Sequence, residues 1–328
     1  MRRMEMKNTL HILLFIMLAS TLSVSAEKLL IFRQGSANFE EVVKAVKAEI
    51  DGELDIVDHV LSKDAKYKEF VDKTRAEKPD LLLLLDNKAV NFAKKFNQEK
   101  DDYAKNLKGV AAMGLNLRKE LEGNKNICAV EYEVPAYTMI TGFRYMVKTD
   151  IKNVLVFYRK SEQQAVIDNA TKLLSKEGIT LKAMNAEEYG ESDEQVNFFL
   201  QRNVMREMYH SDTDLVWVIS DSVLLNNDNF AEVWVNAARK NKKPFIAGIK
   251  TFASPDMQFC AYAASPNHTD LGSQVAEMIF AVIDGSTPEE IGVEYILSVE
   301  KNANLKKVAS NKLELNEERM QDVKVLGK

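Results

Sequence analysis

Polar side chains follow several short apolar runs of this sequence, at the points where buried strands would end. The candidates for contact with a ligand at these points are Gln34, Ser36, Asn87, Tyr158, Ser161, Asp221, Ser222 and Thr251. Their amide, hydroxyl and carboxylate groups could hold a small polar solute by hydrogen bonds. Ser, Asp and Asn also cap helices, so each could instead serve only the helix that follows. As a set they predict a binding cleft at the carboxyl ends of parallel strands.

Signatures of catalysis are missing from the sequence. It has no Gly-x-Gly-x-x-Gly after the first apolar run, no P-loop and no Gly-x-Ser-x-Gly elbow. His59, His210 and His268 lie far apart, and none has a second histidine or a cysteine two to four residues away. His268 lies in a turn before a helix, where it could cap the helix or touch a ligand. We therefore expect no catalytic residue, no metal site and no cofactor.

Alternating apolar runs and amphipathic segments must position the candidate residues. Strands are predicted over 28–32, 54–58, 81–85, 109–113 and 126–131, with helices over 39–50, 67–76 and 88–97. A second series has strands over 153–158, 180–184, 214–219 and 244–249, with helices over 162–177, 194–209 and 229–241. The run at 81–85 is continuously apolar, as in a parallel strand that is buried on both faces. Two α/β lobes with mostly parallel sheets are expected, joined near 131–137.

Aromatic residues gather near this join, and Tyr137 among them could stack on a ligand or pack in the core. Trp217 and Trp234 are expected in the core. Cys128 and Cys260 lie in separate apolar runs, and we expect buried free thiols unless their strands are neighbours, when a disulfide becomes possible.

The length and composition agree with two soluble lobes. The chain has 328 residues, 46% of them hydrophobic and 28% charged, with a net charge of −5. This length fits two domains of ordinary size. Two cysteines exclude a disulfide-rich scaffold, and the mild acidity argues against nucleic acid as the main partner.

The first 26 residues have the pattern of a secretory signal. Arg2, Arg3 and Lys7 precede an apolar run over 10–19, and small residues lead to a cleavage point after Ala26. An uncleaved anchor is the alternative, but the apolar run is shorter than the ~20 residues that span a membrane. Cleavage would leave an exported chain located in the periplasm.

Most of the chain after the predicted signal resembles a known family. The relevant segments are 263–274 with the following helix to Ile283, Asn304 to Ala309, Pro79 to Leu85, Val134-Pro135 and Ile151 to Tyr158. They resemble the ABC-transporter substrate-binding protein family that includes tryptophan- and tyrosine-binding members. Members of that family have the architecture of type I periplasmic binding proteins.

The resemblance implies two Rossmann-like lobes joined by three hinge crossings, with a small ligand trapped between them. Crossings are expected near Val134, Lys250 and Ile291. Residues 27–133 and 252–290 would then form the N-terminal lobe, and residues 134–251 and 291–328 the C-terminal lobe. Ser220-Asp221-Ser222 matches the family's polar loop in the second lobe, and Tyr158 and Ser161 match a second ligand loop.

Some positions depart from the family's pattern. Arg159-Lys160 replaces an Asn-Pro pair, Asp86-Asn87 replaces a Gly-Thr type of turn, and the first loop has no His-Pro pair. These departures weigh against carrying over an aromatic amino acid as the ligand. If the ligand is an amino acid, Asp221 could pair with its ammonium, while Ser36, Asn87 and loop amides could hold its carboxylate.

The sequence therefore predicts an exported, monomeric solute-binding protein of an ABC-type uptake system that delivers its solute to a membrane permease. A ligand-sensing module of the same fold, feeding a membrane sensor, is the alternative. An exported α/β enzyme is a third reading, which the absence of a histidine partner for Ser220 and Asp221 disfavours.

Overall fold

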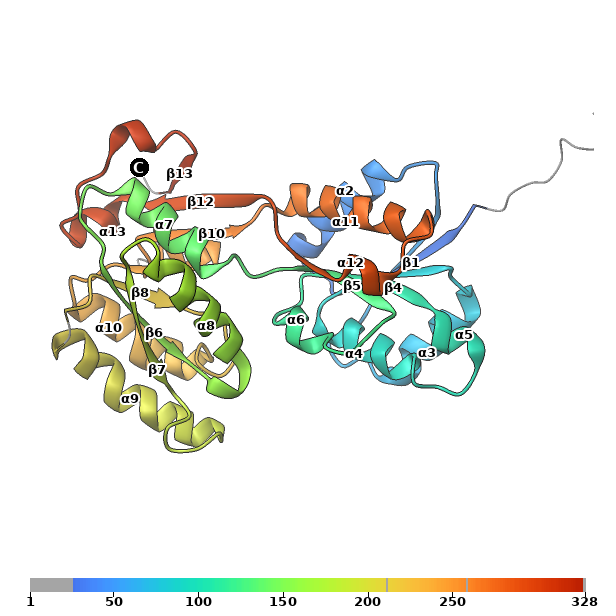
Figure 1. Cartoon of the computed structure of the whole chain (residues 1–328), viewed down its shortest axis with the longest axis horizontal. Coiled ribbons are helices and arrows are strands. Elements are labelled where there is room, and N and C mark those ends of the chain that lie inside the picture. Colours follow the sequence, from blue (N-terminus) through green and yellow to red (C-terminus); the bar gives the residue numbers. More distant parts are fainter. Residues whose placement is uncertain (1–25, 211, 258, 327–328) are drawn as a thin grey trace, which may run out of the picture.

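The computed structural model describes residues 26–210, 212–257 and 259–326. The predicted signal segment, apart from its last residue, lies outside the described residues. Two α/β lobes lie side by side along the long axis of the molecule (Figure 1). No helix of the described part is long and apolar enough to span a membrane. The predicted α/β architecture with two mostly parallel sheets is confirmed.

The first lobe is built on a six-stranded sheet of order β11-β5-β4-β3-β1-β2, in which all neighbours are parallel. Its strands are β1 (Lys28–Arg33), β2 (Asp55–Val60), β3 (Leu81–Leu85), β4 (Lys108–Ala112), β5 (Ile127–Glu131) and β11 (Val293–Tyr295). Its helices are α2 (Ala37–Glu49), α3 (Tyr67–Glu77), α4 (Asn87–Phe96), α5 (Asp102–Asn106), α6 (Leu117–Glu120), α11 (His268–Ile283) and α12 (Pro288–Ile291).

Helices cover both faces of this sheet, which explains its continuous apolar strands. Alternate residues point to opposite faces. Leu81 and Leu83 pack in the core on the side of α2 and α11, whereas Leu82 and Leu84 pack toward α3 and α4. Helices α2 and α11 approach closely at Gly272, where an added Cβ would lie 2.4 Å from the Ala45 Cβ. The late segment 268–295 is thereby fixed to the first lobe.

The second lobe contains a seven-stranded sheet of order β13-β12-β10-β9-β8-β6-β7. Its strands are β6 (Asn153–Tyr158), β7 (Thr180–Asn185), β8 (Leu215–Val218), β9 (Phe245–Ala247), β10 (Tyr262–Pro266), β12 (Val299–Asn304) and β13 (Val323–Leu326). Its helices are α7 (Ala136–Met146), α8 (Lys160–Ser175), α9 (Asp193–His210), α10 (Val235–Lys240) and α13 (Leu305–Ser310), with a π-helical segment at Asn229–Trp234 and 3-10 turns at Lys250–Ala253 and Glu317–Arg319. Strand β12 is antiparallel to β10, and the remaining pairs are parallel.

Trp234 is fully buried in this lobe, with its ring 5.7 Å from that of Phe157 and its indole N–H donating to the carbonyl oxygen of Leu224 at 2.8 Å. Cys128 and Cys260 are buried free thiols. Cys128 belongs to β5 of the first sheet, whereas Cys260 precedes β10 of the second. The two cysteines are therefore not on neighbouring strands, and the condition for a disulfide between them is not met.

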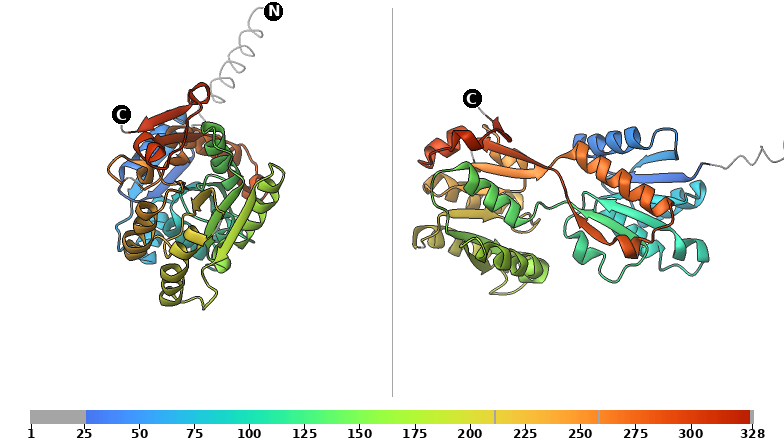
Figure 2. Two further views of the ribbon diagram at one scale, coloured as in Figure 1. Left: turned by 90° about the vertical axis from the view of Figure 1, so that its left-hand side faces the viewer. Right: turned by 45° about the horizontal axis from the view of Figure 1, so that its top comes forward.

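Three connections pass between the lobes, at 132–135, at Asn267 and at 296–298 (Figures 1 and 2). The crossings expected near Lys250 and Ile291, and the lobe boundaries drawn from them, are wrong. Strand β10 pairs with β9, which keeps the chain in the second lobe up to Pro266. Strand β11 pairs with β5, which keeps it in the first lobe up to Tyr295.

Candidate functional site

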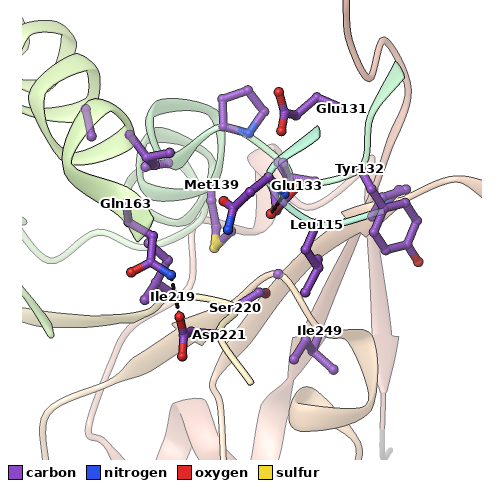
Figure 3. A pocket seen from close by; sticks show the side chains of 18 of the residues that line it. Leu115, Glu131, Tyr132, Glu133, Met139, Gln163, Ile219, Ser220, Asp221 and Ile249 are labelled. Atoms are coloured by element: carbon purple, nitrogen blue, oxygen red, sulfur yellow. Dashed lines mark hydrogen bonds between the residues drawn. The ribbon is translucent and has the colours of Figure 1, made fainter. Parts of the chain in front are cut away.

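A cleft of about 1010 Å³ lies between the two lobes and is lined by residues of both (Figure 3). The first lobe contributes the segments that follow β4 and β5, which carry Leu115, Asn116 and 131–133, together with Asn38 and Glu41 of α2 and Tyr295 of β11. The second lobe contributes the segments after β8 and β9, together with α7 and the start of α8. The carboxyl ends of parallel strands therefore face one another across the cleft, as expected for open α/β sheets.

The loop after β4 is held in place by Asn87. The Asn87 side-chain amide donates to the Leu115 carbonyl oxygen, and its oxygen accepts the Leu115 N–H, both at 2.7 Å. Gly114 allows this close approach, because an added Cβ would lie 2.6 Å from a Leu117 methyl carbon and 3.1 Å from the Asn87 amide oxygen. Asn87 thus positions a lining residue without lining the cleft itself.

Asp221, after β8, is fully engaged within the protein. Arg159 pairs with it at 2.9 Å, Gln163 donates to it at 2.6 Å, and the N–H groups of Val223 and Leu224 donate at 2.8 and 2.9 Å. Burial alone would raise the pKa of Asp221, but the Arg159 guanidinium and the other donors hold that pKa below its usual value. The carboxylate is therefore charged, saturated with donors and already neutralised.

The N-terminus of α8 is also occupied by protein groups. The Lys160 N–H donates to the Asn185 side-chain oxygen at 3.2 Å, and the Ser161 N–H donates to the Glu187 carboxylate at 2.8 Å. The Ser161 hydroxyl donates to the same carboxylate. Although helix N-termini commonly bind anions, Glu187 already supplies the anion at this one.

Two glutamates lie where the chain leaves β5. Glu131 is buried and 3.5 Å from Arg118, and burial raises its pKa despite that partner. Glu133 accepts the Asn116 N–H on one oxygen at 2.9 Å. Its other oxygen, Oε2, is buried and has no hydrogen-bond partner among the described residues. Burial, and then the charge of Glu131, raise the pKa of Glu133 to about 7.

Two of the crossings are joined by Tyr132 and His268. The Tyr132 hydroxyl and the His268 Nε2 are 2.8 Å apart, and the two rings are nearly parallel with centroids 6.0 Å apart. Glu41 lies 3.6 Å from the other ring nitrogen of His268. Burial raises the pKa of Tyr132 to about 12, so the tyrosine is neutral at physiological pH. The pair links the first two crossings beside the cleft.

One ion pair spans the cleft between the lobes. The Lys119 ammonium on α6 donates to the Ser161 carbonyl oxygen and to the Glu162 carboxylate, each at 2.8 Å. Because α6 belongs to the first lobe and α8 to the second, these contacts exist only when the two lobes are close together.

The residues singled out in the sequence divide into two groups. Five line the cleft: Tyr137, Ser161, Asp221, Ser222 and Thr251. Four do not: Gln34, Ser36, Asn87 and Tyr158. Gln34 donates to Asp86, and the Tyr158 hydroxyl donates to Gln164 at 3.0 Å. Trp217, expected in the core, is buried and also borders the cleft.

Sequence reasoning missed the residues that follow β4 and β5, above all Glu133. The segment Glu131-Tyr132-Glu133 was visible as the join between the lobes, and two acids at the end of a buried strand were the available signal. Within the residues that the structure describes, no three His, Cys, Asp or Glu side chains are grouped as a metal site.

The comparisons with known proteins agree on one family and one fold. The family model for ABC transporter substrate binding proteins matches residues 107–323, more than half of the chain. No curated protein sequence matches this chain.

Similar solved structures include the ligand-free, open form of CD0873, a substrate binding protein with adhesive properties from Clostridium difficile. Its TM-score is 0.65 and its identity 15%, over 92% of this chain and 99% of that one. An ABC domain in complex with L-Trp from Streptococcus pneumonia has a TM-score of 0.59 at 16% identity, over 92% and 100% of the two chains. A conserved domain protein from Vibrio cholerae has a TM-score of 0.59 at 14% identity, over the same shares. At these identities the likeness establishes the fold.

Proposed function

The chain belongs to the ABC transporter substrate-binding protein family, and we propose that it captures a small organic solute in the cleft between its lobes. The observation that carries this proposal is the cleft itself. Its volume of about 1010 Å³ exceeds what an amino acid fills, and both lobes contribute side chains to its lining. A small ligand that enters it would contact both sheets at their carboxyl ends.

Capture proceeds by closure of the lobes around the solute. Three crossings connect two separately folded sheets, an arrangement that permits hinge motion while the cores stay intact. The Lys119–Glu162 contact joins the two lobes beside the cleft. The solute stabilises the closed form because only that form lets it touch both lobes at once. No bond of the solute needs to be made or broken.

Export and delivery complete the proposed role. The basic and apolar pattern of residues 1–26 supports secretion into the periplasm with cleavage after Ala26. There the closed, loaded protein would dock on the membrane permease of an ABC transporter. The L-Trp in the Streptococcus structure makes amino acids the first solutes to test.

The test is a screen of the protein, purified after expression of the full chain, against amino acids, amines and other small organic solutes. Thermal unfolding identifies binders, since a solute at 100 times its Kd stabilises the folded state by about 2.7 kcal/mol. Calorimetry then gives the stoichiometry, which we expect to be one solute per chain. A screen in which no solute shifts the unfolding temperature or releases heat would contradict the proposal.

A further inference from the structure

Glu133 differs from every other acidic residue that lines the cleft. Five of the others have a basic partner: Glu131 with Arg118, Glu162 with Lys119, Asp221 with Arg159, Glu300 with Lys250, and Glu41 with His268. Glu122 is exposed to solvent. Glu133 has a buried oxygen, Oε2, for which the described residues supply neither a cation nor a hydrogen-bond donor. Leaving a charged carboxylate unpaired is costly, so Glu133 either takes up a proton or gains a donor from outside.

The surroundings of Glu133 are partly apolar. Among the lining residues labelled in Figure 3, Leu115, Met139, Ile219 and Ile249 are apolar. The polar ones besides Glu133 are Glu131, Tyr132, Gln163, Ser220 and Asp221. A carboxylate in such surroundings acts strongly on a charged partner, because little water is present to screen it. The ligand that fits has an apolar body and one positively charged nitrogen.

An anionic group finds no comparable place at the positions first considered. The amides at the start of α8 are taken by Asn185 and Glu187. Asp221, the residue expected to pair with an ammonium, is neutralised by Arg159 and accepts four donors. The charge that remains available in the buried part of the cleft is therefore negative and belongs to Glu133.

We propose that Glu133 recognises a protonated amine on the solute, so that the cleft selects organic ammonium compounds with an apolar body. This inference rests on the proposed function and adds the chemical class of the solute. Oε2 is buried in this structure, so an ammonium N–H would donate to it after a rotation of the side chain or a hinge movement exposes it to the cleft, while Oε1 keeps the Asn116 amide. Because Glu133 lies on the crossing at 132–135, the bound nitrogen would sit beside the hinge.

Proton release supplies a signature of this contact. The titratable and charged groups around Glu133 are Glu131 and Tyr132 on the same crossing, with Arg118 on α6 beside Glu131. Burial and Glu131 raise the pKa of Glu133 to about 7, so the free protein is partly protonated there at neutral pH. A bound cation favours the carboxylate, and binding should then release up to about half a proton at pH 7.

The first experiment uses the wild-type protein and matched pairs of probes. Each pair is an amine and its des-amino analogue: L-leucine with 4-methylpentanoate, L-tryptophan with indole-3-propionate, and tryptamine with 3-ethylindole. Calorimetric titrations at pH 8 should show binding only by amines. A des-amino analogue that binds as tightly as its amine overturns the inference while leaving the proposed function intact.

The second experiment compares Glu133→Gln with Glu53→Gln, which removes the same charge from an exposed position outside the cleft. A charge-assisted hydrogen bond predicts an affinity loss of about 10–100-fold for the bound amine in Glu133→Gln and none in Glu53→Gln. In the wild type, affinity should rise about ten-fold from pH 6 to pH 8, whereas Glu133→Gln should show no such rise.

Three results separate the possible failures. Equal affinity in Glu133→Gln and wild type overturns the assignment of Glu133. Equal pH dependence and proton release in the two proteins overturn it as well, even if the variant binds more weakly through altered packing. If no probe and no solute of the wider screen binds the wild type, the proposed function itself fails.

Discussion

The buried carboxyl of Glu133 should make the stability of the free protein fall as pH rises from about 4.5 to about 7. The perturbation is Glu133→Gln, which keeps the shape of the side chain and removes its titration. The ordinary pKa of a glutamate, 4.5, describes the unfolded chain, and about 7 describes the folded one. Between these values the folded protein binds more protons than the unfolded protein.

The sign and size of the pH effect on stability follow from this difference in bound protons between the folded and the unfolded protein. Stability falls with pH wherever the folded state holds more protons, so the contribution of Glu133 is fully present below pH 4.5 and lost above pH 7. A shift of this size corresponds to about 3 kcal/mol over the whole window, and to about 2–3 kcal/mol between pH 5 and pH 8. Glu133→Gln should lack this loss, so its free energy of unfolding should increase relative to that of the wild type as the pH rises.

Urea unfolding at pH 5, 6, 7 and 8, followed by circular dichroism, measures the effect. The decisive quantity is the difference in unfolding free energy between variant and wild type as a function of pH. Taking this difference removes most of the contribution of Glu131, which is present in both proteins and has a raised pKa of its own. Parallel stability curves for the two proteins, within about 0.5 kcal/mol, would show that the Glu133 carboxyl does not have a raised pKa in the folded protein.

Three further predictions concern the cleft and its surroundings. Arg159→Met should destabilise the protein by about 3–5 kcal/mol in urea unfolding, because it leaves the buried Asp221 carboxylate unpaired; a loss below 1 kcal/mol would contradict this. Lys119→Met should lower the free energy of unfolding by no more than about 1 kcal/mol, yet increase the radius of gyration in X-ray scattering because the contacts of Lys119 with the second lobe are lost. An unchanged scattering curve would show that these contacts do not hold the two lobes together. Asn87→Ala should release the loop at Leu115, and faster hydrogen exchange of the Leu115 amide in mass spectrometry checks this; unchanged protection would argue against it.

Much of the fold could be predicted because its strands and helices have strong local patterns. Five consecutive leucines in β3 and the periodic apolar residues of α2 indicate their structures without knowledge of the partner elements. Strand β10 was missed because Ala263, Ala264 and Pro266 give it a weak strand pattern, and β11 because it has only three residues. The lobe boundaries depend on the pairing of these two strands with distant ones, which no local pattern reports.

The candidate site could be predicted only in part, and the reason is strand order. The predicted polar residues after β8 and β9 do line the cleft, whereas Gln34, Ser36 and Asn87, predicted after β1 and β3, do not, because the segments after β4 and β5 supply much of the lining of the first lobe. Strands β6 and β8 are neighbours, which brings Arg159 onto Asp221 and removes Asp221 as a partner for the solute. Glu133 is distinguished from the other acidic residues of the cleft by the burial of its Oε2 without a partner among the described residues. Because burial arises only when the lobes are assembled, the sequence alone does not identify this residue.

The most direct test of solute capture between the lobes is a calorimetric titration of Gly248→Phe with a solute that binds the wild type. A Cβ at Gly248 would lie 3.6 Å from the Ser220 hydroxyl and 3.7 Å from the Met139 methyl, both of which line the cleft, so a phenyl ring there occupies the cleft. Ser175→Phe, at the exposed end of α8, adds the same ring outside it. We predict no measurable binding in Gly248→Phe and unchanged binding in Ser175→Phe. Wild-type affinity in a folded Gly248→Phe variant would show that the solute binds outside the cleft, and capture between the lobes would then be wrong.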